Sequence, residues 1–255
     1  MLGKLLKYEI PALGRKLIPL YAAWGAAAIL LGLMIRPSDI DADFFMVLSI
    51  CLYSAIATAI FVMAIIMIVQ RYRNSLLGDE AYFNMVLPVS TSAHIGSKLI
   101  TSIIWIALSG IVAILTGIII LLLSGNMPPL SEVAYMLAQL DGTTIFCAFE
   151  FFILMIAGIV KTVMQIYAAI TIGHQARTHV TMASIGAYIG LGVAESFAAR
   201  LLMLMFPALI EKIQYGYEFA TVQYIVLPGL VVTGALAAAY FFICKALMEK
   251  RLNLN

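Results

Sequence analysis

The sequence has little charge: Asp, Glu, Lys and Arg make up 11% of its 255 residues, whereas an ordinary soluble domain is about a quarter charged. Hydrophobic residues make up 64% of the chain, and the mean hydropathy is +1.05. This composition excludes a water-soluble globule and predicts an all-α polytopic membrane protein. Transport through a bilayer, chemistry within it and sensing from it remain as classes of function.

Several chemical signatures are also missing. The three cysteines, Cys51, Cys147 and Cys244, fall in or beside different apolar stretches and form no CxxC pair, so we expect neither a disulfide framework nor a metal site. The sequence contains no GxxxxGK[ST] phosphate loop, no GxSxG elbow and no HExxH pair. We therefore expect no enzymatic activity and no cofactor in this chain, and any ATP-driven work requires a separate polypeptide.

Six apolar stretches are present instead, each at least 19 residues long, which is enough to cross about 30 Å of hydrocarbon. We predict spans at Leu17–Ile35, Phe44–Val69, Leu99–Leu123, Ile145–Ile170, Ala183–Met205 and Tyr224–Ala246. No linker is long enough to separate domains, so residues 1–255 are predicted to form one membrane domain.

The distribution of Lys and Arg predicts the orientation. With both termini inside, the inner segments and adjoining span ends hold twelve of these residues: Lys4, Lys7, Arg15, Lys16, Arg71, Arg73, Lys98, Lys161, Arg177, Lys245, Lys250 and Arg251. The outer ones hold Arg36, Arg200 and Lys212. By the positive-inside rule, both termini are predicted to be cytoplasmic.

Residues 1–16 place leucines and Ile10 at helical spacing, with most of the basic residues off that stripe. This pattern predicts an amphipathic helix in the inner membrane interface, which Pro11 would kink or divide. Two interpretations stay open, namely an anchor for the first span and an elbow that contacts a cytoplasmic partner.

The polar segment 70–98 is the most informative one. Asp79 and Glu80 follow Gly78, where acidic groups favour the start of a short helix, and Pro88 ends it. Ser90, Thr91 or Ser92 can cap a second helix that runs through Lys98 into the third span.

This short helix carries an apolar surface next to its acidic start: Tyr82, Phe83, Met85 and Val86. Aromatic and Met side chains concentrate in the cores of protein interfaces, so the segment is typical of a docking surface. A turn that only reconnects two spans is the alternative.

Three patches of the sequence resemble a known family: LLGDEAYFNMVLPVSTSAHIGSKLI, LKYEIPALGRKLIPLY and KRLNL. They are similar to small six-span bacterial permease subunits of ABC-2 type transporters. The resemblance implies a cytoplasmic ABC ATPase that binds ATP and Mg, a second permease copy of the same or another kind, and location in the bacterial plasma membrane. It also implies that Gly78 to Pro88 is the ATPase-coupling helix, with Asp79 and Glu80 as contacts, and that residues 206–223 form an outer cap. An ordinary aromatic belt at the membrane edge is the alternative for that last segment.

Two other polar segments interrupt the spans. The segment 173–181 contains His174, Arg177 and His179, which we interpret as inner-surface polar groups or as a second contact with the ATPase. The two histidines are five apart, unlike the i, i+4 pair of a zinc site. Leu130, Val133, Leu137 and Leu140 share one face of a predicted helix on the outer leaflet.

The charged residues within the predicted spans include Glu150, Lys161, Glu195 and Arg200. An uncompensated charge there costs at least about 2.5 to 3.5 kcal/mol. Counted from the span ends, Glu150 and Arg200 lie at similar depth, which predicts an ion pair. Lys161 is predicted to snorkel to the inner surface. Glu195 lies near mid-membrane without an obvious partner, so we expect it to be protonated, paired across a subunit boundary, or facing a wet path.

One face of the fifth span consists of small residues at i, i+4 spacing: Gly186, Gly190, Ala194 and Ala198. This seam predicts close helix packing, against this chain or another permease. Together the patterns predict the permease subunit of an ATP-driven exporter of a hydrophobic or peptide-like substrate, with lipid but no nucleic acid as a further partner. A non-transporting sensor or assembly partner is one alternative, and an intramembrane enzyme is another.

Overall fold

The structure is a computed structural model that describes residues 2–35, 42–77, 90–176, 179–205 and 219–251. In these ranges it contains seven α-helices: α1 (Leu2–Met34), α2 (Ala42–Leu76), α4 (Thr91–Ser124), α5 (Leu130–Ala138), α6 (Gly142–Gly173), α7 (Val180–Met205) and α9 (Phe219–Arg251).

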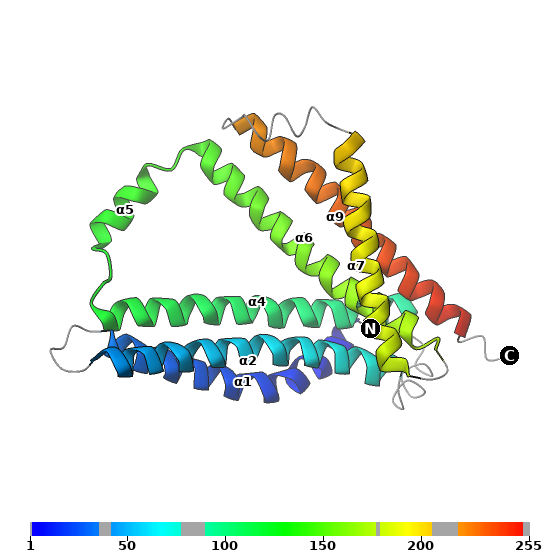
Figure 1. Cartoon of the computed structure of the whole chain (residues 1–255), viewed down its shortest axis with the longest axis horizontal. Coiled ribbons are helices and arrows are strands. Elements are labelled where there is room, and N and C mark those ends of the chain that lie inside the picture. The colour runs from blue at the N-terminus through cyan, green and yellow to red at the C-terminus, as the bar shows by residue number, and fades with distance from the viewer. Residues whose placement is uncertain (1, 36–41, 78–89, 177–178, 206–218, 252–255) are drawn as a thin grey trace. The chain divides into compact units, whose positions relative to one another are not determined.

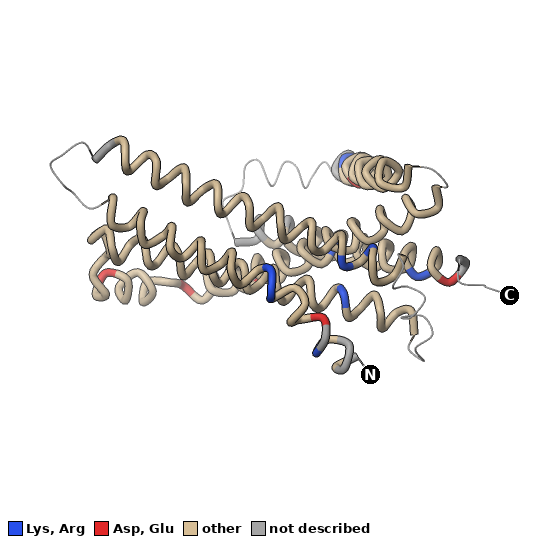
Figure 2. Tube along the Cα trace, turned by 90° about the horizontal axis from the view of Figure 1, so that it is seen from below, with Lys and Arg blue, Asp and Glu red and all other residues tan. Residues whose placement is uncertain are grey.

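Six of the described helices are long and apolar enough to cross a membrane, judged by length and composition. They are α1, α2, α4, α6, α7 and α9. Each contains one predicted span in full, except that Ile35, the last residue of the first predicted span, lies directly after α1. Figure 2 shows long uncharged stretches along these helices. A helix satisfies its own backbone hydrogen bonds, which a bilayer core cannot do for it. The prediction of an all-α, multi-pass membrane protein is confirmed at this level.

The chain divides into two compact units. The first contains residues 1–71 and 100–139, and the second contains residues 72–99 and 140–255. The division falls within α2, after Arg71, and within α4, before Ile100. Each of these two helices therefore begins in one unit and ends in the other.

In the first unit α1, α2 and α4 run side by side (Figure 1). Leu13 and Leu17 of α1 form a buried cluster with Met67 of α2 and Trp105 of α4. An ion pair of 2.6 Å joins Glu9 to Arg71 across α1 and α2. The apolar stripe of the amino-terminal segment therefore continues into the protein core, which the sequence analysis did not predict.

Hydroxyl groups add two links between these helices. The Tyr21 and Ser109 hydroxyls lie 2.6 Å apart, joining α1 to α4. The Tyr53 and Thr116 hydroxyls lie 3.0 Å apart, joining α2 to α4. Each link satisfies polar atoms that would otherwise be costly within an apolar span.

The amino-terminal segment and the first span are one continuous helix. Pro11 and Pro19 both lie inside α1, so the helix is not divided at Pro11. A proline removes one backbone donor and leaves the carbonyl four residues earlier without its usual partner. The helix continues past both positions, and Leu13 and Leu17 pack against α2 and α4 on that same stretch.

Two local predictions are confirmed. The Ser90 side chain accepts a hydrogen bond from the Ala93 amide at 3.4 Å, which is the capping arrangement predicted for the helix that runs through Lys98. The helix predicted from Leu130, Val133, Leu137 and Leu140 is α5, which begins at Leu130 and ends at Ala138, so that Leu140 lies just beyond it.

In the second unit α6 is the central helix, because both α7 and α9 pack against it. Its buried residues near the carboxyl-terminal end include Met164, Tyr167 and Ala168. Cys244 of α9 is fully buried in the same unit. This packing positions the charged side chains of α6 and α7.

Candidate functional site

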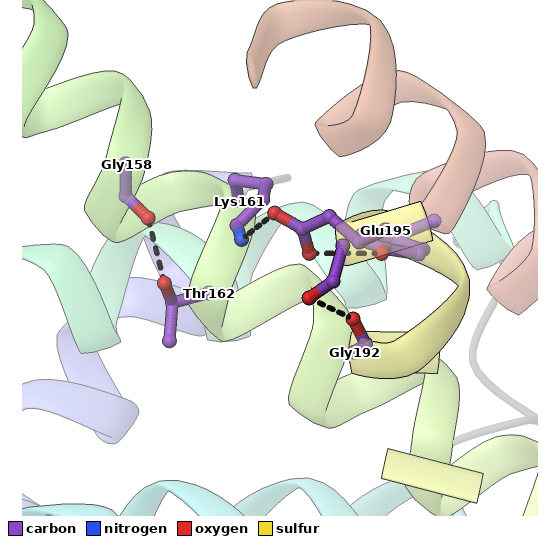
Figure 3. A network of polar contacts seen from close by, with 7 residues as sticks. Gly158, Lys161, Thr162, Gly192 and Glu195 are labelled. Atoms are coloured by element: carbon purple, nitrogen blue, oxygen red, sulfur yellow. Dashed lines mark hydrogen bonds and ion pairs between the residues drawn. The ribbon is translucent and has the colours of Figure 1, made fainter. Parts of the chain in front are cut away.

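A network of three polar side chains joins α6, α7 and α9. The Lys161 ammonium lies 2.5 Å from the Oε1 atom of Glu195 (Figure 3). The Tyr240 hydroxyl donates to Oε2 of the same carboxylate at 3.5 Å, the outer limit for a hydrogen bond. All three residues belong to the second unit and to helices that can span a membrane.

Helical spacing brings further residues to this network. Gln165 follows Lys161 by four positions on α6, and Gly192 and Tyr188 precede Glu195 by three and seven on α7. Such spacings place side chains on one helix face. The amide nitrogen of Gln165 lies 3.7 Å from the place a Cβ atom would take at Gly192. The two faces therefore meet, and we call Lys161, Gln165, Gly192, Glu195 and Tyr240 the polar recess.

The polar recess lies far from the ends of its helices. Lys161 stands twelve residues before Gly173, the last residue of α6, and Glu195 stands fifteen residues after Val180, the first of α7. At 1.5 Å per residue these positions are about 18 Å and about 22 Å from the helix ends. The pair is thus located in the apolar middle of both helices, where opposite charges compensate each other.

The structure gives Lys161 and Glu195 a partner that the sequence analysis did not find, namely each other. Lys161 does not depend on reaching a membrane surface, because it pairs with Glu195. Glu195 has its partner within the same chain, so pairing across a subunit boundary is not required. The sequence analysis misses this pairing because it counts depth from the apolar ends of the spans, whereas α6 and α7 form a hairpin whose turn sets the register.

The predicted ion pair between Glu150 and Arg200 is also not formed, although the structure describes both residues. The Gln223 amide donates to Oε2 of Glu150 at 2.5 Å instead. Gln223 belongs to α9, which packs along α6, whereas Arg200 is exposed on α7. The comparison of depths misses this neutral partner, because the sequence analysis places Gln223 in the predicted outer segment 206–223 and not in a span.

A second cluster, which we call the aromatic clamp, consists of Tyr72, Tyr167, Thr171 and Met248. The Tyr72 and Tyr167 rings stack with centroids 4.0 Å apart and planes 9° from parallel. The Tyr72 hydroxyl lies 2.8 Å from that of Thr171 and donates to the Met248 sulfur at 3.8 Å. The clamp thus joins the end of α2 to α6 and α9. Sequence analysis missed it, because nothing distinguishes these two tyrosines in a chain with many aromatic residues.

The predicted coupling residues lie outside the described residues: Gly78, Asp79, Glu80, Tyr82, Phe83, Met85 and Pro88. Both flanks of that segment are described. Ser75 and Leu76 are buried at the end of α2, and His94 and Ile95 are buried in the first turns of α4. These flanks belong to the second unit, together with the aromatic clamp and the polar recess.

The remaining predicted site residues do not join either cluster. His174 directly follows α6 as its C-cap, and its ring Nδ1 lies 2.9 Å from the Ile170 carbonyl oxygen, while Arg177 lies outside the described residues. Within the described ranges no three His, Cys, Asp or Glu side chains come together as a metal site would require.

The small-residue seam faces away from the rest of the described chain. All four of its residues are exposed: Gly186, Gly190, Ala194 and Ala198. No described atom lies within 4 Å of the place a Cβ would take at Gly186 or Gly190. The close packing predicted for this face is therefore not made within the described part of the chain.

The fold and its charged pair define a multi-pass membrane protein with a compensated polar site inside its spans. Comparison with known proteins adds no family to this class, since no protein-family model, curated protein or solved structure matches the chain.

Proposed function

We propose that this chain is the membrane-spanning permease subunit of an ATP-driven exporter of the ABC-2 type. Six helices that can span a membrane support a transporter. The excess of Lys and Arg in the predicted inner segments supports a cytoplasmic position for the segment between α2 and α4 and for both termini. The lack of a phosphate loop requires that ATP and Mg bind to a separate ATPase.

The observation that carries the proposal is the aromatic clamp. The segment from Gly78 to Pro88 connects the end of α2 to the start of α4, and Tyr72 holds that end of α2 against α6 and α9. A stacked aromatic pair and one net hydrogen bond each contribute on the order of 1 kcal/mol. A force applied to the segment would therefore reach α6 and α9, the helices that carry Lys161 and Tyr240.

In this mechanism the chain performs no covalent chemistry. ATP binding closes the ATPase, which moves the docked segment and, through the clamp, changes the packing of α6 and α9. The polar recess on these helices then gains access to one side of the bacterial plasma membrane or the other. A second permease copy completes the path, and the substrate is a hydrophobic or peptide-like molecule.

Docking is tested by replacing Asp79 and Glu80 with lysine together and purifying the full chain from its native membranes. The wild type should retain an ATPase whose hydrolysis is measurable in the eluate, and the double variant should lose most of that activity, because two acidic contacts become repulsive. Glu132→Lys on the exposed helix α5 is the matched control and should change nothing. Equal ATPase activity in all three preparations would contradict the coupling role.

Orientation is tested by labelling single cysteines with a membrane-impermeant maleimide, after replacing the three native cysteines with alanine. A cysteine at Asn84 should react only in permeabilised cells, and one at Ser131 of α5 should react in intact cells. The reverse pattern would overturn both the orientation and the transporter proposal.

A further inference from the structure

The polar recess has more hydrogen-bonding capacity than its own residues use. Gln165 is 5% exposed, and the described residues provide its side-chain amide with no hydrogen bond. The amide atoms of Gln165 are not among the fully buried unpaired polar atoms of the described chain, so they remain accessible to a further group. Opposite it, a glycine at position 192 leaves room that a larger side chain would fill. An unused amide beside an ion pair is typical of a place that receives a polar group from elsewhere.

The carboxylate is the more available member of the ion pair. The Glu195 side chain is 25% exposed and that of Lys161 is 17% exposed. Oε1 of Glu195 is engaged by Lys161, but the only bond recorded to Oε2 within the described chain is the long one from Tyr240. A carboxylate oxygen accepts about two hydrogen bonds, so Oε2 has room for a further cation, with or without a hydrogen-bond donor. Lys161 would have to leave its carboxylate in order to bind an anion.

One tyrosine contacts this carboxylate and a second precedes it on the same helix. The Tyr240 hydroxyl is in hydrogen-bond contact with Glu195, and Tyr188 lies two turns before Glu195 on α7. An aromatic ring attracts cations to its face, with a strength that rises when water is excluded. A carboxylate with tyrosines in its neighbourhood therefore favours a positively charged group.

The surface next to the recess is apolar. On α7, Ile189 and Val193 follow Tyr188 and Gly192 directly, and both are more than half exposed. A ligand whose charged group enters the recess would place its remaining body against these side chains or in the surrounding lipid. An organic cation with a bulky apolar body fits both parts of this surface.

We propose that Glu195 binds the positively charged group of an amphiphilic substrate, in exchange for Lys161, with Gln165 and the tyrosine rings as additional contacts. That this ligand is a substrate rests on the proposed transport function. Lys161 acts as the resident cation, which compensates Glu195 when the recess is empty and is displaced when the ligand enters. The ligand class is thereby limited to apolar cations such as phosphonium or quaternary ammonium compounds and cationic peptides.

The test uses tetraphenylphosphonium, an apolar cation, and tetraphenylborate, an anion of nearly the same shape. Binding of each is measured by equilibrium dialysis against the full chain in lipid nanodiscs, and binding to empty nanodiscs is subtracted. The wild type should bind the phosphonium and retain little borate. Lys161→Met should tighten phosphonium binding about tenfold or more, because the resident competitor is gone and a tenfold change requires only about 1.4 kcal/mol.

Two further variants address folding. Glu195→Gln should weaken phosphonium binding at least tenfold. The double variant Lys161→Met/Glu195→Gln leaves no unpaired charge in the span, so it should fold and should bind neither ion. Glu132→Gln on the exposed helix α5 is the matched control.

Equal phosphonium binding by the wild type and the double variant would overturn the proposal. So would borate binding that Lys161→Met abolishes, since the recess would then be an anion site. The assay contains no ATPase, so its result is separate from the docking experiment. A protein that binds phosphonium but retains no ATPase would contradict only the transport function, and a protein that retains the ATPase but binds no phosphonium would contradict only this inference.

Discussion

The ion pair between Lys161 and Glu195 predicts strong thermodynamic coupling between two side chains 34 positions apart. Lys161→Met leaves Glu195 without its cation in the middle of a span, which costs about 3 kcal/mol on insertion scales. Each single replacement should thus lower the free energy of unfolding by about 3 kcal/mol.

The free energy of unfolding of the double variant Lys161→Met/Glu195→Gln should be within about 1 kcal/mol of that of the wild type. Replacing both members of a buried pair removes the attraction between them, but it also removes the cost of taking the two charges out of water. The coupling energy is then at least about 2 kcal/mol. Reversible unfolding in mixed detergent micelles, followed by circular dichroism, measures all four proteins. The pair Lys245 and Glu249 is the matched control, since at 3.9 Å and largely exposed it should couple by about 0.3 to 0.5 kcal/mol. Purely additive effects of the single replacements would show that the two side chains do not form a unit.

Two further predictions concern packing in each unit. Gly32→Ala should lower the stability of the folded chain by about 1 to 3 kcal/mol, because the new Cβ would lie 2.8 Å from the Cβ of Leu123. Gly186→Ala should be neutral or slightly stabilising, since no described atom lies within 4 Å of the place its Cβ would take. Thermal unfolding followed by circular dichroism compares them, and equal losses would contradict the packing. Tyr72→Phe should retain the ring stack and lose only its hydroxyl contacts, lowering stability by about 1 kcal/mol, or about 2 to 4 °C in Tm at this chain length. No change in the same assay would show that the hydroxyl of Tyr72 is not engaged.

The features that could be predicted from the sequence are those that depend on near neighbours. The spans follow from long apolar runs, and the start of α4 follows from Ser90, whose side chain bonds to an amide three residues later. The helix after Pro129 follows from apolar residues spaced three and four positions apart. These signals are local, so the rest of the chain does not alter them.

Contacts between helices were predicted poorly, because several partners of suitable chemistry exist for each polar side chain. Glu150 could be matched with Arg200 by depth alone, yet the depth of Gln223 was misjudged because α9 begins five residues before the predicted span. The aromatic clamp is a stronger example. Choosing Tyr72 and Tyr167 among twelve tyrosines requires the register of three helices, which no local pattern in the sequence contains.

The pairing of Lys161 with Glu195 could nevertheless have been predicted by counting residues from the turn between the two helices. Two antiparallel helices joined by a short turn are aligned at that turn, so residues at similar distances from it become neighbours. Lys161 and Glu195 lie about 18 Å and about 22 Å from the helix ends at the turn, and the length of a lysine side chain covers the difference of about 4 Å. Counting from apolar boundaries fails here because such boundaries shift with any polar residue near a membrane surface, whereas a short turn fixes the register of both helices. Charged residues inside the spans of a helical hairpin are therefore better paired by their distance from the connecting turn, and a match within one side-chain length predicts compensation within the same chain.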